Sequence, residues 1–459
     1  MCLQKDGATY FILKIKRIRM LHKDNSLNIL KKGVWLFFFL LIFEGALRKW
    51  FVPFLATPLL VVRDPIALWI LFEVWRRKLL KFNPYIFAVF IVTAISFILT
   101  LIVGHGNLYV AIFGARIYFI YFPLIFAIGK IFDKEDVIKM GRTLLIISIP
   151  MLILIMLQFY SPQSAWVNRG VGGDMEGAGF GGAMGYFRPP GTFSFTAGNS
   201  MFWGLVAAFV IYFWVVPNQI NKKLLITSSI CLLMASMFSI SRSVLFQIAL
   251  SIVFALFFFM KKPENMKRII SILIPLLLIF AVVSLLPQFQ LARDVMSARF
   301  ENANEAEGGL AEGVIGNRFF GGFIREIQSS VNMPFWGFGL GMGTNAGSAM
   351  MVGERVFLIS EGEWGRVFGE MGFLFGSIII ILRALLVVQL FIKSFKQWQK
   401  NPLPYMLLSF GALAIISGQW GMPTSLGFAV LTGGLIMASL NDKRYEKNNT
   451  FTPYRQPER

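Results

Sequence analysis

Two short arginine motifs stand out among the polar segments of this sequence. Arg188 is followed directly by two prolines and a glycine, which restrict the backbone next to it. Arg242 lies between two serines, in a short turn between two apolar runs. A guanidinium group presents a planar fork of N–H donors that matches the oxygens of a phosphate. Arginines that converge on one pocket would suit a diphosphate. The alternative is that each one pairs with a carboxylate or caps a helix end.

Two further arginines extend this set of candidate diphosphate ligands. Arg116 lies inside an apolar run, where a charge is costly unless it is paired or faces water. Two carboxylates are available to pair with it, Glu44 and Asp64. Arg355 belongs to a long polar insert at 287–364, which contains arginines but no lysine. Both arginines are candidates for the same anion, with an ion pair as the alternative role for Arg116.

Glutamates at the end of this insert are the candidate proton acceptors. Glu361 and Glu363 stand where the insert leads into an apolar run, and Glu370 lies further along that run. On a helix, Glu361 and Glu363 would project to different sides. The chain has two histidines, and neither is favoured as a base, because His22 lies in a basic terminal segment and His105 in a short turn. The alternative for the glutamates is an acidic helix start that interacts favourably with the helix dipole.

Other motifs argue against metal and dinucleotide sites. No metal-ligand spacing appears, and the two cysteines predict neither a disulfide framework nor a metal site. The alternating glycines at 337–343 lack the strand–helix unit of a dinucleotide fingerprint, so we interpret them as a close-packed turn. The glycine-rich segment at 170–185 is typical of a mobile flap.

The composition is that of a membrane protein. Of the 459 residues, 56% are hydrophobic and 15% are charged, whereas a soluble domain has about 25% charged residues. The net charge of +20 is compatible with nucleic-acid binding. The lysines and arginines, however, form short clusters between apolar runs rather than one basic face, so we expect no nucleic-acid partner.

The apolar runs predict an all-α integral membrane protein with about twelve transmembrane helices. The runs cover about 33–46, 63–78, 84–103, 109–129, 143–160, 200–216, 224–240, a stretch that ends before Lys261, 269–286, 367–392, 403–417 and 425–440. They divide the chain into five regions: a basic tail at 1–32, spans one to nine at 33–286 with a loop at 161–199, the large loop at 287–364, spans ten to twelve at 365–440, and a basic tail at 441–459.

Lysine placement predicts the orientation of these spans. With an even number of spans, both termini lie on one side, and every lysine except Lys49 falls on that same side. The two long loops contain no lysine. Because positively charged residues accumulate in cytoplasmic segments, we expect both termini in the cytoplasm and both long loops outside, which in a bacterium is the periplasm.

Three of these motifs together resemble the O-antigen ligase and O-antigen polymerase superfamily of bacterial membrane proteins. The first is Arg188-Pro-Pro-Gly-Thr-Phe, and the second is Ser241-Arg242-Ser243. The third is Gly337-Phe-Gly-Leu-Gly followed by Glu361 and by Glu370-Met-Gly-Phe-Leu-Phe-Gly. Their order along about twelve spans, with a long outer loop between late spans, is similar to the family pattern, and the resemblance covers most of the chain.

The resemblance implies a GT-C-like fold and a metal-independent glycosyltransferase of the bacterial inner membrane, with no cofactor. Such enzymes transfer a glycan from an undecaprenyl-diphosphate carrier to an acceptor glycan or glycolipid. Arg188 and Arg242 match the arginines thought to hold the diphosphate, and Arg116 and Arg355 are further candidates. Ligases carry a histidine about nine residues before the glutamate–x–glycine motif, where this chain has Glu361, counted back from Glu370.

This departure points to a polymerase, or to a divergent ligase that uses a carboxylate. Glu361 or Glu363 would then accept the proton of the acceptor hydroxyl, and we expect Glu361 to lie in a membrane-buried setting. Trp336 and Trp364 are candidates to stack on sugar faces, or else belong to an interfacial aromatic belt. The alternative function is a polysaccharide or lipid transporter or flippase, with the arginines lining a passage.

Overall fold

The computed structural model describes residues 27–260, 285–307, 333–354 and 356–441, together with single positions at 274, 278, 280–282, 284, 326 and 328. Helix makes up 74% of it. The described residues also include one two-stranded antiparallel sheet, in which β1 (Phe180–Ala183) pairs with β2 (Tyr186–Arg188). The predicted all-α class is therefore confirmed, with a short hairpin added to it.

A helix over residues 27–46 begins the described chain. It continues into a π-helical turn, η1 (Leu47–Phe51), and two 3-10 turns, η2 (Pro53–Leu55) and η3 (Pro58–Val61). The elements that follow are α2 (Arg63–Arg76), α3 (Pro84–Ile102), α4 (Leu108–Arg116), η4 (Ile117–Tyr121), α5 (Phe122–Ile131), α6 (Lys134–Tyr160), η5 (Trp166–Asn168), α7 (Thr196–Val215), α8 (Lys222–Phe238), α9 (Arg242–Met260), α11 (Pro287–Glu307), α13 (Asn345–Val352), α14 (Glu363–Gln397), α15 (Leu403–Ile416) and α16 (Pro423–Leu440).

Among the described residues, seven helices are long and apolar enough to cross a membrane. They cover Pro84–Ile102, Leu108–Ile131, Lys134–Tyr160, Thr196–Val215, Arg242–Phe259, Glu363–Gln397 and Pro423–Leu440. These helices are those of a multi-pass membrane protein. Each predicted run except the ninth coincides with a helix, although several of these helices are shorter than a full span. The ninth, at 269–286, lies largely outside the described residues.

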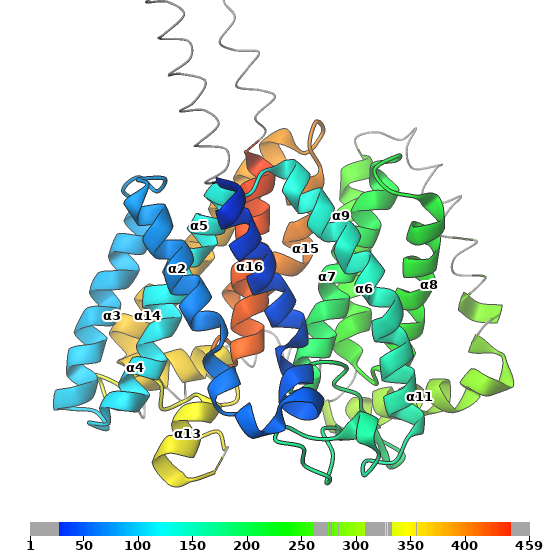
Figure 1. Ribbon diagram of the computed structural model, residues 1–459, viewed down its shortest axis with the longest axis horizontal. Helices are drawn as coiled ribbons and strands as arrows, with labels where there is room; N and C mark the ends of the chain where they lie inside the picture. Colours follow the sequence, from blue (N-terminus) through cyan, green and yellow to red (C-terminus); the bar gives the residue numbers. More distant parts are fainter. Residues whose placement is uncertain are drawn as a thin grey trace, which may run out of the picture.

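The two ends of the helix bundle differ in what they carry (Figure 1). One end, here called the lysine end, holds the first and last described residues. There Lys31 pairs with Asp133 at 3.1 Å, and the Asn441 amide donates to a backbone carbonyl of α5 at 2.8 Å. The opposite end, here called the loop end, carries the β1–β2 hairpin, α11 and α13. The described parts of both predicted long loops therefore lie opposite the ends of the described chain.

The alternating glycines form the expected close-packed turn. Gly337, Gly339 and Gly341 have φ angles of +80°, +115° and +86°, which residues other than glycine rarely adopt. A Cβ atom on Gly341 would lie 2.2 Å from the Val110 carbonyl oxygen of α4. The backbone N–H of Leu340 donates to the Thr100 hydroxyl of α3 at 2.9 Å. The turn thus attaches the large loop to the first half of the bundle.

Candidate functional site: a cavity at the loop end

A cavity of about 420 Å³ opens where several helices end at the loop end. Its walls come from the β1–β2 hairpin, the start of α7, the α8–α9 turn, the segment before α14, and the turn between α15 and α16. Both an arginine and a glutamate line it, Arg188 and Glu361. Its hydroxyl and amide side chains include Thr196, Ser200, Ser241, Ser243, Gln247, Gln419 and Ser425. Two candidate residues that are far apart in the sequence therefore share one cavity, which polar and apolar side chains line together.

Arg188 reaches the cavity from the last position of β2. Its guanidinium carbon lies 4.7 Å from the centre of the Phe180 ring on β1. This places the cation over an aromatic face, which is favourable and limits the motion of the side chain. The glycine-rich segment expected to be a mobile flap thus contributes a paired strand, β1, that supports the arginine.

The backbone behind Arg188 is anchored from three directions. The Asn199 side chain of α7 donates to the carbonyl of Pro189 at 3.0 Å. Gln158 of α6 bonds both to the N–H of Gly191, at 2.8 Å, and to its carbonyl, at 3.2 Å. Thr192 donates to a backbone carbonyl of the helix over 27–46 at 2.6 Å. A backbone with this many fixed points holds the arginine in place before any ligand arrives.

Lys49 supplies a fourth anchor that sequence reasoning did not assign. Its side chain is fully buried, with 0% exposure, and its ammonium group donates to the carbonyl of Gly191 at 2.7 Å. Burial lowers the pKa of Lys49 to about 7, because a charge is costly in a dry site. In the predicted topology, Lys49 is the one lysine on the outer side, and this exception could have indicated a special role for it.

The serine–arginine turn contributes its serines to the cavity. Ser241 and Ser243 are lining residues, and the Ser241 hydroxyl shares a hydrogen bond of 2.8 Å with Ser200 of α7. Arg242 is half-buried at the first position of α9 and is not among the lining residues of the cavity. The two serines of the turn therefore line the cavity, whereas Arg242, the predicted diphosphate ligand between them, does not.

Glu361 lies at the edge of the cavity, two residues before α14 begins. Its side chain is exposed in the protein, and the expected membrane-buried setting stays a prediction. The helix begins at Glu363, so Glu361 belongs to the segment that precedes it. The Gln419 amide donates to the backbone carbonyl of Glu361 at 2.8 Å, which ties this segment to the α15–α16 turn. Glu361 is therefore both exposed and part of the lining of the cavity.

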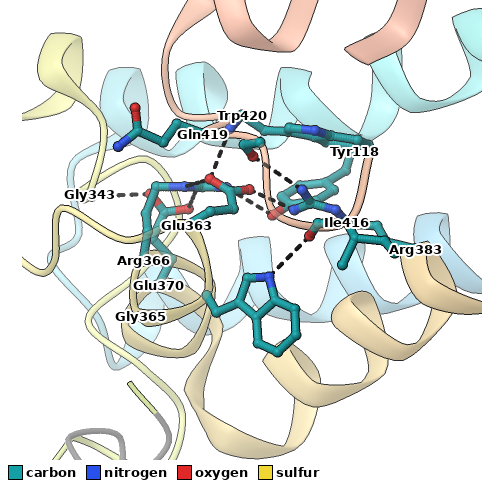
Figure 2. A network of polar contacts seen from close by, with 12 residues as sticks. Tyr118, Gly343, Glu363, Gly365, Arg366, Glu370, Arg383, Ile416, Gln419 and Trp420 are labelled. Atoms are coloured by element: carbon teal, nitrogen blue, oxygen red, sulfur yellow. Dashed lines mark hydrogen bonds and ion pairs between the residues drawn. The ribbon is translucent and has the colours of Figure 1, made fainter. Parts of the chain in front are cut away.

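Glu363, two residues later, belongs to a buried cluster of charges (Figure 2). It is 4% exposed and pairs with Arg366 at 2.9 Å and with Arg383 at 2.6 Å. Arg366 also pairs with Glu370 at 2.6 Å. The backbone N–H of Trp420 completes the shell of Glu363 at 2.9 Å. Two carboxylates and two guanidinium groups balance one another, as buried charges require.

This cluster holds one wall of the cavity. Arg383 donates to the carbonyl of Ile415 at 2.7 Å and to that of Gly418 at 3.2 Å. Its guanidinium carbon lies 4.0 Å from the centre of the Trp420 ring, and the indole N–H of Trp420 donates to the Ala414 carbonyl at 3.0 Å. These contacts fix the end of α15 and the turn after it. Glu363 and Arg383 thus hold a wall of the cavity in place and are not themselves lining residues.

Arg116 has the ion pair that was its alternative role. Its guanidinium pairs with Asp64 at 2.5 Å, and Tyr121 donates to the other oxygen of that carboxylate at 2.6 Å. Glu44, the other carboxylate considered, pairs instead with Arg48 at 3.3 Å and with Arg63 at 3.0 Å. Arg116 is not a lining residue of the cavity. Arg355, the fourth predicted ligand, lies outside the described residues.

The two tryptophans expected to contact sugar also lie apart from the lining of the cavity. Trp336 is 40% exposed and packs near Phe335 and Phe375, with ring centroids 4.6 and 6.1 Å away. Trp364 is half-buried, and its indole N–H donates to the Ile416 carbonyl at 3.0 Å. Their proposed contact with sugar stays a prediction.

Glu326 is a further carboxylate that sequence reasoning missed. It accepts a hydrogen bond from the backbone N–H of Gly365 at 3.0 Å, in the first turn of α14. Burial raises the pKa of Glu326, and the nearby charge of Glu363 adds to the effect. A carboxylate at a helix N-terminus is favourable. No local pattern connected a residue so far back in the loop to this helix.

Comparisons with known proteins returned no match. No protein-family model, no curated protein and no solved structure is similar to the chain at a significant level. Among the residues that the structure describes, no three or more histidine, cysteine, aspartate or glutamate side chains form a group that could hold a metal ion. The functional argument therefore depends on the geometry of the cavity.

Proposed function

We propose that the protein is a membrane glycosyltransferase that moves a glycan from an undecaprenyl-diphosphate carrier to an acceptor glycan or glycolipid. The reaction is that of an O-antigen or exopolysaccharide polymerase or ligase, on a GT-C-like fold of about twelve spans. The observation that supports it is the shared cavity of Arg188, the Ser241–Ser243 turn and Glu361. Each of the three resembling motifs contributes to this one cavity.

The proposed reaction uses the cation of Arg188 and the carboxylate of Glu361 in the cavity. The oxygen of an acceptor hydroxyl attacks the anomeric carbon of the donor sugar, and the bond from that carbon to the diphosphate oxygen breaks. Its electron pair leaves with the diphosphate, whose growing negative charge Arg188 and the hydroxyl groups of Ser241 and Ser243 stabilise. Glu361 takes the proton of the attacking hydroxyl.

Glu361 is a better proton acceptor in this scheme than Glu363. The carboxylate of Glu361 is exposed at the cavity, whereas that of Glu363 is buried against Arg366 and Arg383. A carboxylate that already accepts bonds from two guanidinium groups and a backbone N–H is a poor proton acceptor. We therefore assign catalysis to Glu361 and support of the cavity wall to Glu363.

The proposed orientation puts the loop end in the periplasm and the lysine end in the cytoplasm of a bacterial inner membrane. Lysines of the described chain such as Lys31, Lys130 and Lys223 belong to segments at the lysine end, as the positive-inside rule requires. A lipid-linked glycan exported to the outer leaflet would meet the cavity at the loop end. The membrane lipid is then both solvent and carrier of the donor.

A transporter or flippase is the second candidate, favoured by one specific observation. α14 is interrupted at Gly372, where φ is +73° and ψ is 171°, close in sequence to the buried charges of Arg366, Glu370 and Arg383. Interrupted helices beside buried charges are common in transporters. In the transferase proposal this interruption makes room for the chain at Phe335, whose carbonyl oxygen would lie 2.0 Å from a Cβ on Gly372.

Reconstitution separates the two functions. Purified protein in liposomes is given a diphosphate-linked glycan and an acceptor, and the lipid and glycan products are measured. Release of free undecaprenyl diphosphate together with an extended glycan supports the transferase. Movement of an unchanged glycan across the bilayer supports the transporter and contradicts the proposal. Arg188→Gln serves as the inactive control and Arg76→Gln, an exposed arginine at the end of α2, as the matched one.

A further inference from the structure

An open cleft of about 540 Å³ lies at the lysine end, away from the proposed active site. It lies between the start of the helix over 27–46 and the start of α6. Its lining residues are Asn28, Ile29, Lys31, Lys32, Trp35, Asp136 and Lys139. Nothing in the proposed transfer reaction uses this cleft.

The lysines of the cleft have different partners. Lys31 is bound to the carboxylates of Asp133 and Asp136, at 3.1 and 2.5 Å, and so holds the two helices together. Lys32, on the first helix, and Lys139, on α6, are exposed and both line the cleft. Two ammonium groups that share a cleft between two helices are suited to the oxygens of a phosphate.

Exposed apolar side chains follow these lysines along each of the two helices. On the first helix, Leu36 and Phe39 follow Lys32 at helical spacing and are 50% and 40% exposed. On α6, Ile146 and Ile153 follow Lys139 and are both 55% exposed. Exposed apolar stripes on neighbouring helices of a membrane protein are surfaces for acyl chains. Each stripe therefore has a lysine at its polar end.

Trp35 supplies an aromatic side chain of the kind found at membrane interfaces. It lines the cleft, is half-buried, and packs near Phe39 and Phe132 with ring centroids 5.8 and 6.4 Å away. Tryptophan is enriched where the hydrocarbon core meets the headgroups, because one part of the indole is apolar and its N–H is polar. The cleft thus combines Trp35 with lysines, and exposed apolar residues continue along both helices beyond it.

We propose that this cleft binds one anionic phospholipid, with its phosphate between Lys32 and Lys139 and its acyl chains along the two apolar stripes. A soluble anion would use the lysines but not the stripes, and a zwitterionic lipid would bring its own cation to two lysines. The bound lipid would bridge the first helix and α6. Both helices also anchor the Arg188 loop at their other ends, through Thr192 and Gln158. The inference does not depend on the transferase proposal.

Native mass spectrometry of the purified full chain tests the proposal. The protein in detergent is titrated with phosphatidylglycerol or with phosphatidylcholine of the same acyl chains. We expect tighter binding of the first phosphatidylglycerol, and Lys32→Gln/Lys139→Gln should weaken it by about 30-fold, at about fivefold for each lysine near the headgroups. The matched control is Lys222→Gln/Lys223→Gln, which removes two exposed lysines at the start of α8, also at the lysine end. It should bind as the wild type does.

Three outcomes would overturn the proposal. Equal losses in both double variants would mean that net charge, and not this cleft, attracts the lipid. Equal affinity for the two lipids would remove the role of the lysines. Displacement of the lipid by inorganic phosphate at equal concentration would assign the cleft to a soluble anion. Because Lys32 and Lys139 are exposed, the variants should melt within about 1 °C of the wild type in the absence of lipid, which separates lost binding from lost folding.

Discussion

The same change, glutamate to glutamine, should lower stability at Glu363 and lower the rate of glycan transfer at Glu361, although the two positions are two residues apart. Glu363 is 4% exposed and bound to two arginines, whereas Glu361 is exposed at the cavity. Glutamine keeps the shape of the side chain and removes its charge. The comparison therefore asks whether each carboxylate supports the fold or acts on a substrate.

The structure sets the size of the Glu363→Gln effect. Without that charge, Arg366 keeps the carboxylate of Glu370, but buried Arg383 keeps only the backbone carbonyls of Ile415 and Gly418. Breaking a buried ion pair by neutralising one partner costs about 3–5 kcal/mol, because the other charge remains buried and uncompensated. In a chain of this length such a loss lowers the apparent Tm by on the order of 5 °C.

Glu361→Gln should instead leave the melting temperature within about 1 °C of the wild type, since exposed substitutions change stability by less than about 0.5 kcal/mol. The rate of glycan transfer should fall about a hundredfold or more, while the lipid-linked donor still binds. Thermal unfolding in detergent and transfer in liposomes measure the two effects on the same preparations. A Glu361→Gln variant that transfers at the wild-type rate would refute the assignment of the base. A Glu363→Gln variant with unchanged melting would refute the structural role of the cluster.

Three further expectations concern the anion site and its support. Arg188→Lys should lower the transfer rate about a hundredfold, because an ammonium group keeps the charge but loses the fork, and near-normal transfer would count against diphosphate binding there. Transfer should survive EDTA, because Arg188 supplies the positive charge, and activity lost in EDTA and restored by magnesium would contradict this. Lys49 has a pKa lowered to about 7, so between pH 7 and 9 the unfolded chain binds more protons at this group and wild-type stability should rise. Between these pH values, the free energy of unfolding of the wild type should rise by about 2 kcal/mol more than that of Lys49→Met, which has no titrating group there. Profiles of Tm against pH that run parallel for the two proteins would disprove burial of a titrating lysine.

The helices were predictable because apolar runs and their breaks are local features. Glycine alternation at 337–343 likewise predicted a close-packed turn. The ion pair of Arg116 was foreseen as one of two choices, and only the three-dimensional arrangement selects Asp64 over Glu44. Membership of the fold class therefore follows from the sequence, while partner choice does not.

The site was less accessible to sequence reasoning for a physical reason. Which of two neighbouring glutamates is buried depends on where α14 begins, and helix ends are set by contacts with distant segments. The i, i+3 and i, i+4 spacing of Glu363, Arg366 and Glu370 was a visible signal for a paired cluster. Arg383 gave no such signal, because its partners are Glu363, 20 residues earlier in α14, the last turn of α15 and the residues just after it.

Electron cryomicroscopy of the protein with a bound undecaprenyl-diphosphate-linked glycan tests the central claim most directly. The diphosphate should lie in the loop-end cavity, within hydrogen-bond distance of Arg188 and of the Ser241–Ser243 turn, with the first sugar next to Glu361. Glu361→Gln is the variant to use, since it should hold the donor without turning it over. Diphosphate density outside this cavity, with Arg188 in contact with protein alone, would contradict the account.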